Sequence, residues 1–497
     1  MLLLLPAVCT GETNPASVAA RKWRQLHERT IVEEFVSLLA IPNVTSDRPN
    51  VARNASAIVA LLEKRGIAAR LLSVSGASPL VFGALRTPGA VRTIVFYAHY
   101  DGQPLNPAEW ATPPFTPALR TQSLERDGQV IPLPAAGVAF DPEWRIYARS
   151  ASDDKAPIIA LVSALDAIRA AGLKLKSNVK FVFEGEEEAG STHLEQILTA
   201  HRELLAGGVW LICDGPVHQT RRPLIDFGAR GVVTLDITTY GPRRELHSGH
   251  YGNWAPNPAM QLARLLVSVK DETGRILIEN FHDGIVPLGE TEKRAIAEAP
   301  PVEPELMREL WLGTTEGAPK TLNELLALPS LNIRGMASSR TGAQASNVIP
   351  AIATAALDIR LVKGMDHRQT VARVIDHVRK QGFFVVDSEP GPELRMRHPK
   401  VAMVRVRERG YNAVRTSMDL PISQEVIRTV ESAVGPAVKL PTIGGSVPIE
   451  MIERALAVPT ILIHIANHDN NQHSFNENIR IQNLWDGIEL MAALLTM

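Results

Sequence analysis

Apolar residues in the first half of the chain form short continuous runs that alternate with segments of helical spacing. Thr93–Ala98, Asn178–Phe183 and Trp210–Cys213 are rich in β-branched and aromatic residues, as expected for buried strands. Ala55–Lys64 and Pro157–Ala171 carry apolar residues at helical spacing. Strands that alternate with helices predict an α/β fold, with a mostly parallel sheet flanked by helices on both faces. Reactive side chains in such folds gather at the carboxyl ends of the strands.

The pattern changes near Gly228, where a separate α+β unit is predicted. Its expected strands and helices are Gly231–Thr239, Pro258–Val269, Ala351–Val362, Gln369–Gln381 and Phe383–Val386. The earlier pattern then resumes with helix Ile422–Val434, strand Thr460–His464 and helix Asn483–Leu495. We therefore expect one domain to be split by another: a catalytic domain of residues 20–227 and 406–497, and an inserted domain of residues 228–405.

Composition restricts the partners and the chemistry. Lys and Arg total 52 against 53 Asp and Glu, so the formal net charge of -1 argues against nucleic acid or an acidic membrane as the main partner. No apolar stretch is long enough to span a bilayer. The two cysteines, Cys9 and Cys213, cannot build a disulfide framework or a cysteine-rich zinc site. Any metal site must therefore use histidine and carboxylate ligands.

The apolar start of the chain, residues 1–10, has two open interpretations. It resembles the end of a secretory signal peptide without the basic region that precedes such a segment. The alternative is an ordinary frayed terminus. The first interpretation implies a periplasmic or secreted protein and the second a cytoplasmic one. No lipid anchor is expected, because Val8 is a poor cleavage residue ahead of Cys9.

Five polar motifs carry the candidate chemistry. His99 and Asp101 follow the first predicted strand, the acids of Glu184–Glu188 follow the second, Asp214 follows the third, and a polar loop with His473 follows the last. Asp153 lies just ahead of the predicted helix that begins at Pro157. Each motif alone has an ordinary explanation as a turn, a helix start or a solvated loop. Together we expect all five at strand ends of one sheet, where ligands converge.

The acidic motif gives the strongest physical argument for a cation. Its four carboxylates leave an apolar strand between glycines, and they repel one another unless a cation or basic partners hold them. His99 and Asp101 are two residues apart, so on a strand they share a face. A metal-bound histidine usually needs a carboxylate that orients its ring, and Asp101 can supply it.

These motifs and their order resemble the M20 metallopeptidases, the family of carboxypeptidase G, aminoacylase and the carnosinase-type dipeptidases. The resemblance extends from about His99 to the C-terminus and is greatest to the carnosinase-type branch. The motifs that carry it are Trp110 with Pro114-Phe115, Asp153-Asp154-Lys155, Glu184-Gly185 with Glu187-Glu188 and Gly190-Ser191, Leu246-His247-Ser248-Gly249, Arg360-Leu361-Val362, Gly444-Gly445-Ser446, and His473-Ser474 with Asn476-Glu477.

The resemblance implies a centre of two divalent metal ions in each chain. Asp153 would bridge the ions, Glu187 would be the general base, and Asp101 would support His99. One ion would be held by His99 and Asp214, and the other by Glu188 and His473. This mixture of ligands suits Zn²⁺ and leaves Mn²⁺ and Co²⁺ open.

In the inserted domain, the resemblance implies a lid and a dimerisation surface. His247 would reach across a homodimer to stabilise the oxyanion, and Arg360 would bind the substrate carboxylate. Gly444, Gly445 and Ser446 would form a loop that contacts the substrate. Without the family pattern, His247 has the ordinary interpretation of a loop histidine and Arg360 that of a surface ion pair.

The function predicted from these residues is a two-metal hydrolase that cuts a peptide or amide bond near a free carboxylate, as a dipeptidase or carboxypeptidase-like exopeptidase. The alternative is an N-acyl-amino-acid amidohydrolase. Ile443 favours that alternative, because carnosinase-type enzymes often carry Glu before Gly-Gly-Ser. A non-catalytic binding protein on the same fold is a third interpretation, opposed by Glu187 and the full ligand set. The stretch between Phe115 and Arg149 is long for the family, and we expect it to reshape the pocket rim.

Overall fold

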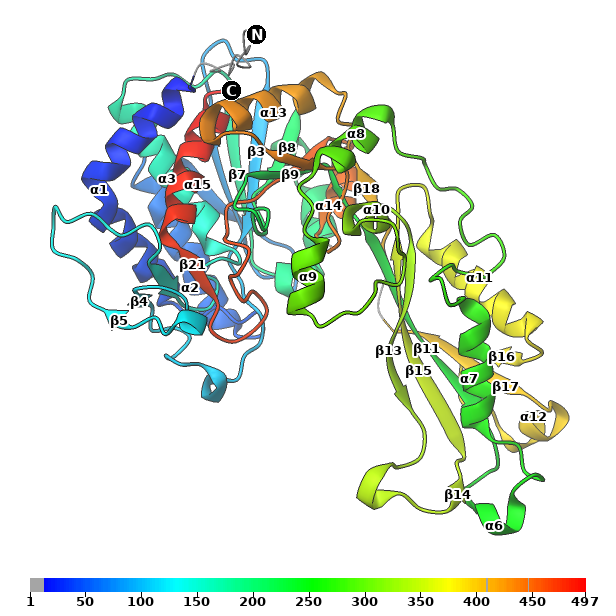
Figure 1. Ribbon diagram of the computed structural model, residues 1–497. Coiled ribbons are helices and arrows are strands. Elements are labelled where there is room, and N and C mark those ends of the chain that lie inside the picture. Colours follow the sequence, from blue (N-terminus) through cyan, green and yellow to red (C-terminus); the bar gives the residue numbers. More distant parts are fainter. Residues whose placement is uncertain (1–12, 408–409, 446) are drawn as a thin grey trace, which may run out of the picture.

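A computed structural model describes residues 13–407, 410–445 and 447–497. The apolar start of the chain and Ser446 therefore lie outside the described residues. Figure 1 shows two lobes, a larger one that carries the C-terminus and a smaller, elongated one. The larger lobe is built on an eight-stranded sheet and the smaller lobe on a five-stranded sheet. No helix in the described ranges has the length and hydropathy needed to cross a bilayer.

The larger sheet confirms the predicted α/β fold. Its central strands β7, β3, β8 and β20 run parallel to one another. The flanking pairs β1–β2, β2–β7 and β9–β20 are antiparallel, whereas β9–β19 is parallel. The strand order is β1 (Ala68–Leu72), β2 (Leu80–Leu85), β7 (Asn178–Glu184), β3 (Thr93–His99), β8 (Val209–Ile212), β20 (Thr460–Ile463), β9 (Leu224–Asp226) and β19 (Val438–Leu440).

Helices cover both faces of the larger sheet, because its central strands are apolar on both sides. Along β3, Phe96 packs into the core under helices α1 (Pro15–Leu39), α3 (Lys155–Ala170) and α15 (Ile481–Leu495). Its neighbour Tyr97 packs on the opposite face under α4 (Leu194–Ala200) and α14 (Ile449–Leu456). The remaining helices of this lobe are α2 (Arg48–Glu63), α5 (Arg202–Leu205) and α13 (Pro421–Val434).

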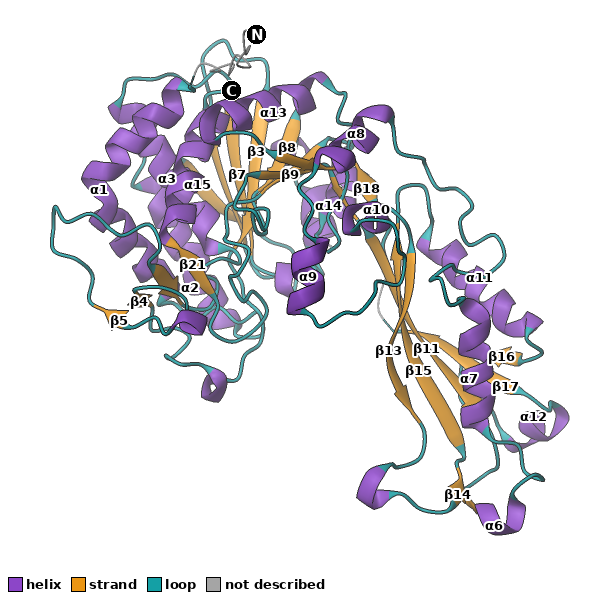
Figure 2. Ribbon diagram, viewed as in Figure 1, coloured by secondary structure: helices purple, strands orange, loops and turns teal. Residues whose placement is uncertain are grey.

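The smaller lobe has a sheet in the order β13 (Ser330–Ala337), β15 (Ile352–Leu361), β11 (Gly231–Tyr240), β17 (Val401–Val406) and β16 (Phe384–Val386). Helices α7 (Pro258–Val269) and α11 (His367–Lys380) pack on it, as Figure 2 shows. β13 is an edge strand, and most of its residues are exposed. The far end of this lobe holds β12 (Leu246–His247), β14 (Val348–Ile349) and α6 (Ser248–Tyr251), and α12 (Pro392–Arg397) lies near β17.

The chain passes between the lobes through two short strands that pair with each other. These are β10 (Gly228–Ala229) and β18 (Val414–Arg415), which are antiparallel. A β-carbon on Gly228 would lie 2.1 Å from the carbonyl oxygen of Val414, so only glycine permits this approach. A third connection, residues 290–326, carries α8 (Glu290–Glu298), α9 (Glu303–Glu309) and α10 (Leu322–Leu326). Ala295 of α8 packs into the core of the larger lobe.

One expectation about the motifs is wrong. Asp153 does not follow a strand of the larger sheet. It follows β6 (Arg145–Tyr147), which belongs to a separate four-stranded sheet with β21 (Asn478–Arg480), β4 (Ala118–Arg120) and β5 (Val130–Ile131). The long stretch between Phe115 and Arg149 supplies three strands of this sheet, so it builds a support beside the larger sheet.

Candidate metal centre

Three neighbouring strands bring their polar ends to one place. His99 is the last residue of β3, Glu188 lies in the turn that follows β7, and Asp214 follows β8. Because these strands are adjacent and parallel, their carboxyl ends meet at one edge of the sheet. Asp153 comes from the turn before α3, and His473 comes from the loop after β20.

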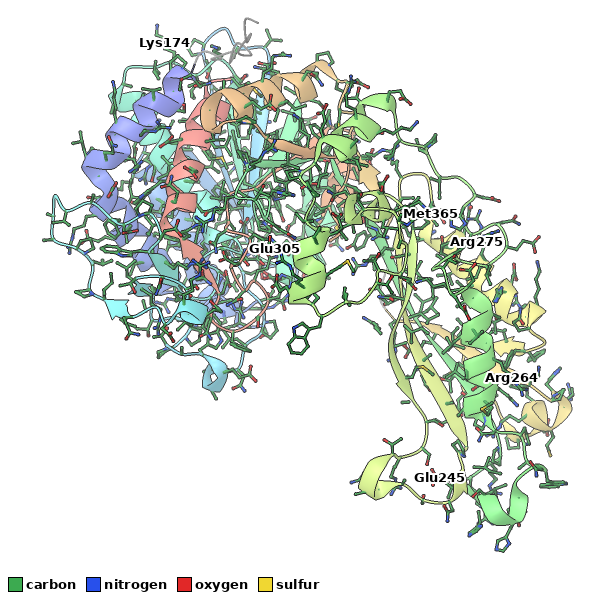
Figure 3. The ribbon with its side chains drawn as sticks, in the orientation of Figure 1. Lys174, Glu245, Arg264, Arg275, Glu305 and Met365 are labelled. Atoms are coloured by element: carbon green, nitrogen blue, oxygen red, sulfur yellow. The ribbon has the colours of Figure 1, made fainter. Side chains whose placement is uncertain are left out.

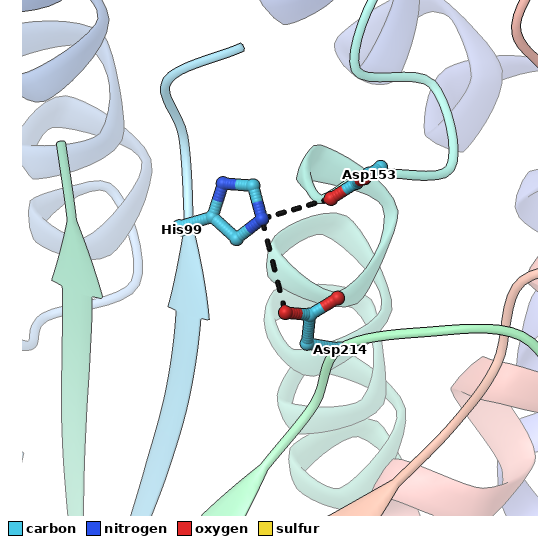
Figure 4. A group of neighbouring side chains, drawn as sticks. All are labelled: His99, Asp153 and Asp214. Carbon is cyan, nitrogen blue, oxygen red and sulfur yellow. Dashed lines mark hydrogen bonds and ion pairs between the residues drawn. The ribbon is translucent and has the colours of Figure 1, made fainter. Parts of the chain in front are cut away.

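The first group of candidate ligands is buried and consists of His99, Asp153 and Asp214 (Figure 4). His99 Nε2 lies 2.9 Å from Asp153 Oδ1 and 3.9 Å from Asp214 Oδ2. The three potential ligand atoms lie within 4.8 Å of one another. One imidazole nitrogen and two carboxylate oxygens at this spacing suit a divalent cation such as Zn²⁺.

The second group consists of Asp153, Glu188 and His473, again within 4.8 Å of one another. His473 Nε2 lies 3.1 Å from Asp153 Oδ2 and 3.4 Å from Glu188 Oε2. Asp153 thus offers one oxygen to each group. The structure brings together all five residues that the sequence nominated as metal ligands, around one shared carboxylate.

The charges of the protein alone favour a cation here. Burial, together with the nearby Asp153 carboxylate, raises the pKa of Asp214 to about 6 and that of Glu188 to about 8. The hydrogen bond to Asp153 raises the pKa of His473 to about 9. Carboxyls that resist ionisation in a crowded, buried place are stabilised as carboxylates when a cation joins them. The donor set therefore fits the metal ions that the family implies.

Asp101 connects the first group to the acidic turn. Its Oδ1 accepts a hydrogen bond from the Glu187 amide and its Oδ2 one from the Glu188 amide, both at 3.1 Å. Oδ1 also faces His99 Nδ1 at 3.5 Å, and Thr45 Oγ1 donates to Oδ2 at 2.8 Å. One fully buried carboxylate thus positions the His99 ring and the backbone that carries Glu187 and Glu188.

Glu187 lines the same cavities as several of the candidate ligands. It lines two cavities, one of about 490 Å³ and one of about 200 Å³, which also share His473 and Val447. Burial raises the pKa of its carboxyl, and the charges of Asp214 and Glu188 raise it further. A carboxylate with a raised pKa beside both a metal site and a cavity has the properties of a general base.

The expected effect of the long stretch before Arg149 on the pocket rim is wrong. None of the described residues 116–148 lines either cavity next to Glu187. The strands of this stretch pack beside β21 instead.

The sequence motifs contained a supporting residue to which no role was assigned. Glu477 is buried and accepts hydrogen bonds from the backbone amides of Ser152 and Asp153, both at 2.9 Å. Arg149 Nη1 also donates to it, at 2.9 Å. Glu477 therefore fixes the turn that presents Asp153. The motif His473–Glu477 signalled its presence, but only the hydrogen bonds show what it holds.

His247 lies apart from this centre. It ends β12 at the far tip of the smaller lobe, where Figure 3 labels Glu245, two residues earlier. Its Nδ1 accepts a hydrogen bond from the Gly249 amide at 3.1 Å, and its ring lies 4.5 Å from that of His250. Within one chain, therefore, His247 is not brought to the metal ligands.

Arg360 is on β15 and forms an ion pair with Asp358 at 3.0 Å. It lines neither of the two cavities beside Glu187. Gly444 and Gly445 do line the larger cavity, as expected of a loop that contacts a substrate. Of the predicted substrate residues, the structure thus places two beside the candidate centre.

Comparison with known proteins agrees with this geometry. The sequence matches the model of peptidase family M20/M25/M40 over residues 95–497. A Cys-Gly metallodipeptidase of Schizosaccharomyces pombe is 27% identical over 485 residues, which cover 92% of this chain and 94% of the relative. A Beta-Ala-His dipeptidase of Homo sapiens is 27% identical over 427 residues, which cover 84% of this chain and 76% of the relative.

A solved structure shares the fold along almost the whole chain. An M20 family metallo-carboxypeptidase of Sulfolobus solfataricus aligns with a TM-score of 0.74 at 24% identity, covering 94% of this chain and 98% of the other. The chain belongs to peptidase family M20, a family of hydrolases that act on peptide bonds. The predicted family and the predicted enzyme class are confirmed.

Proposed function

We propose that this protein is a two-metal dipeptidase. The observation that carries the proposal is the Asp153 carboxylate, which lies within 3.1 Å of a histidine in each of two ligand groups, next to Glu187. The names of the two relatives supply the substrate class, since one acts on Cys-Gly and the other on β-Ala-His.

Five residues are proposed to hold the two ions: His99 and Asp214 for the first, Glu188 and His473 for the second, and Asp153 for both. Divalent ions at this place would lower the pKa of water and polarise the scissile carbonyl. Nitrogen and carboxylate ligands together favour Zn²⁺, with Mn²⁺ and Co²⁺ as alternatives.

Glu187 is proposed as the general base. Its raised pKa lets it take a proton from the attacking water and pass that proton to the leaving amine. Asp101 holds the Glu187 amide, so the carboxylate stays in place while the proton moves. Asp101 is accordingly a positioning residue.

The protein is proposed to act as a homodimer, in which the smaller lobe of one chain contributes to the active site of the other. His247 lies at the end of that lobe, and Arg360 lies outside the cavities, so neither reaches the ligands of its own chain in this structure. β13 is an exposed edge strand with Ile333 and Met336 on the surface, the kind of edge that another chain covers. A second copy would then place its His247 by the oxyanion, and Arg360 would bind the substrate carboxylate after the lobes close.

An N-acyl-amino-acid amidohydrolase is the second candidate, because Ile443 lines the larger cavity without an acidic group of its own. The test is a release assay with dipeptides and N-acyl amino acids, before and after chelation, together with metal analysis. Hydrolysis of dipeptides that needs about two ions per chain supports the proposal. Cleavage of N-acyl amino acids alone would establish the second candidate instead.

A further inference from the structure

The larger cavity beside the metal centre is lined by polar and by apolar side chains. Asp153, Glu187, Asp214 and His473 are among its polar lining residues. Much of the apolar lining comes from two separate parts of the chain. Leu440, Ile443 and Val447 belong to the larger lobe, and Val302, Leu322 and Leu326 belong to the connection of residues 290–326.

The connection of residues 290–326 lies against the loop that carries Gly444 and Gly445. A β-carbon on Gly444 would lie 3.0 Å from Leu326 Cδ2, so the absence of a side chain at Gly444 lets Leu326 approach closely. Figure 3, in which Glu305 marks α9, shows this helix between the two lobes. Leu326 is therefore a wall of the cavity within a single chain.

Hydrogen bonds fix the position of this wall. Thr321 and Glu324 form a capping box at the start of α10: the Glu324 amide donates to Thr321 Oγ1 at 3.3 Å, and the Thr321 amide donates to Glu324 Oε2 at 2.7 Å. The Leu322 amide donates to Glu303 Oε1 at 2.8 Å, which ties α10 to α9. Because these hydrogen bonds hold α10 in place, we expect the cavity to distinguish substrate side chains by their shape.

The charges around the cavity show which half of a dipeptide it accepts. None of the described residues that line it is lysine or arginine. Besides the metal-centre acids, its lining includes Asp226, which is buried and paired with His464 at 2.8 Å. A free carboxylate would find no lysine or arginine among the described residues of this lining, and His473, which does line it, is a candidate metal ligand. The residue on the amino side of the scissile bond, which has no carboxylate, is thus the one that fits.

We propose that this cavity binds the side chain of the amino-terminal residue of the substrate, that it selects a large apolar side chain such as leucine or phenylalanine, and that Leu326 determines this selection. The inference rests on the proposed dipeptidase function. It adds a substrate class and a specificity residue, which lies on a helix that carries neither the metal ligands nor Gly444 and Gly445.

The test compares kcat/KM for Leu-Gly and Gly-Gly in the metal-loaded enzyme. The wild type should prefer Leu-Gly, and Leu326→Ala should reduce that preference about tenfold, because three side-chain carbons are removed from the contact with the substrate. Leu328→Ala is the matched control. Leu328 lies two residues further along, is 39% exposed and does not line the cavity, so its removal should keep the wild-type preference.

A second variant, Leu326→Asp, guards against a loss of folding. A carboxylate in the wall should raise kcat/KM for Lys-Gly relative to Leu-Gly, a gain that a misfolded protein cannot show. Equal losses on Leu-Gly and Gly-Gly in Leu326→Ala, or a wild type without preference between them, would overturn the inference while the dipeptidase proposal stands. A loaded wild type that cleaves no dipeptide overturns both.

Discussion

The two lobes differ in whether their candidate functional residues already lie together in a single chain. In the larger lobe, five candidate ligands from distant parts of the sequence already lie around Asp153. In the smaller lobe, His247 is exposed at the tip, and Arg360 is paired with Asp358. The first arrangement is a property of one folded chain, because contacts within the chain hold all five ligands and most of them are at least partly buried, His473 being the exposed one. The second arrangement needs a further event, either lobe closure or a second chain.

The largest effect is expected from Glu187→Gln, which tests the group of residues that already lie together in the larger lobe. We expect this variant to keep its metal ions and to lose roughly 10²–10⁴-fold in kcat, because only proton transfer is removed. Glu184→Gln is a matched control. Glu184 is buried and accepts a hydrogen bond from Tyr97, and burial raises its pKa to about 7, so a neutral amide is tolerated there. Metal analysis and steady-state kinetics on both variants decide the point, and near-normal turnover in Glu187→Gln would place the base elsewhere.

The smaller lobe, whose His247 does not lie near the metal ligands of its own chain, is tested by His247→Ala. If a partner's histidine stabilises the oxyanion, kcat should fall roughly 10²–10³-fold with no change in metal content. His250→Ala, which alters the neighbouring ring, should have a much smaller effect.

Mixing the His247→Ala and Glu187→Gln variants makes the test of His247 more specific. In a mixed dimer of His247→Ala with Glu187→Gln, one site has both groups intact, so activity should return once subunits exchange. Exchange is followed with two differently tagged chains. Exchange without recovery would contradict the shared site and leave the larger lobe as a complete enzyme.

A smaller effect is expected at Asp101, inside the assembled lobe. Asp101→Asn keeps the shape but replaces one acceptor oxygen with a donor, so it can no longer accept from both the Glu187 and the Glu188 amides. We expect metal affinity to fall roughly 10–100-fold, as is usual for the partners of metal ligands. Thr45→Val removes only one hydrogen bond to Asp101 and should cost less. Affinity is measured by competition with a chromophoric chelator, and equal effects of the two changes would rule out the role given to Asp101.

The smallest effect concerns pH. Glu188 and His473 have pKa values of about 8 and 9 in the protein alone, so both hold protons at neutral pH. A metal ion must displace those protons, so its affinity falls as the pH decreases below 8. The first group has fewer protons to lose there: the pKa of His99 is raised by Asp101 and Asp153, so His99 must lose a proton as His473 does, but the pKa of Asp214 is only about 6. Titrations at pH 6, 7 and 8 should therefore show the second ion weakening more steeply, and parallel weakening of both ions would contradict this.

Much of the larger lobe could be predicted from apolar patterns. The runs at Thr93–Ala98 and Asn178–Phe183 became β3 and β7 because both of their faces are buried. Helix α2 begins at Arg48, seven residues before the expected start, because Asp47 caps it and accepts from the Asn50 amide. That cap was visible in the sequence, but the polar first turn concealed the helix.

Other features could not be read from the sequence because tertiary contacts create them. Ser330–Ala337 is a strand whose side chains are mostly exposed, so it has no apolar alternation to reveal it. The role of Glu477 depends on a turn formed far away in the chain. The proximity of Leu326 to Gly444 likewise follows from how residues 290–326 cross to the larger lobe.

The hydrogen bonds between Glu477 and the turn that carries Asp153 have a consequence during translation. These two residues are 324 positions apart, and a ribosome adds about 5–20 residues each second. The growing chain therefore carries the acidic residues of the metal centre for tens of seconds before Glu477, which fixes the Asp153 turn, is synthesised. A nascent chain arrested before Glu477 would hold His99, Asp153, Glu188 and Asp214 in an unfinished cradle.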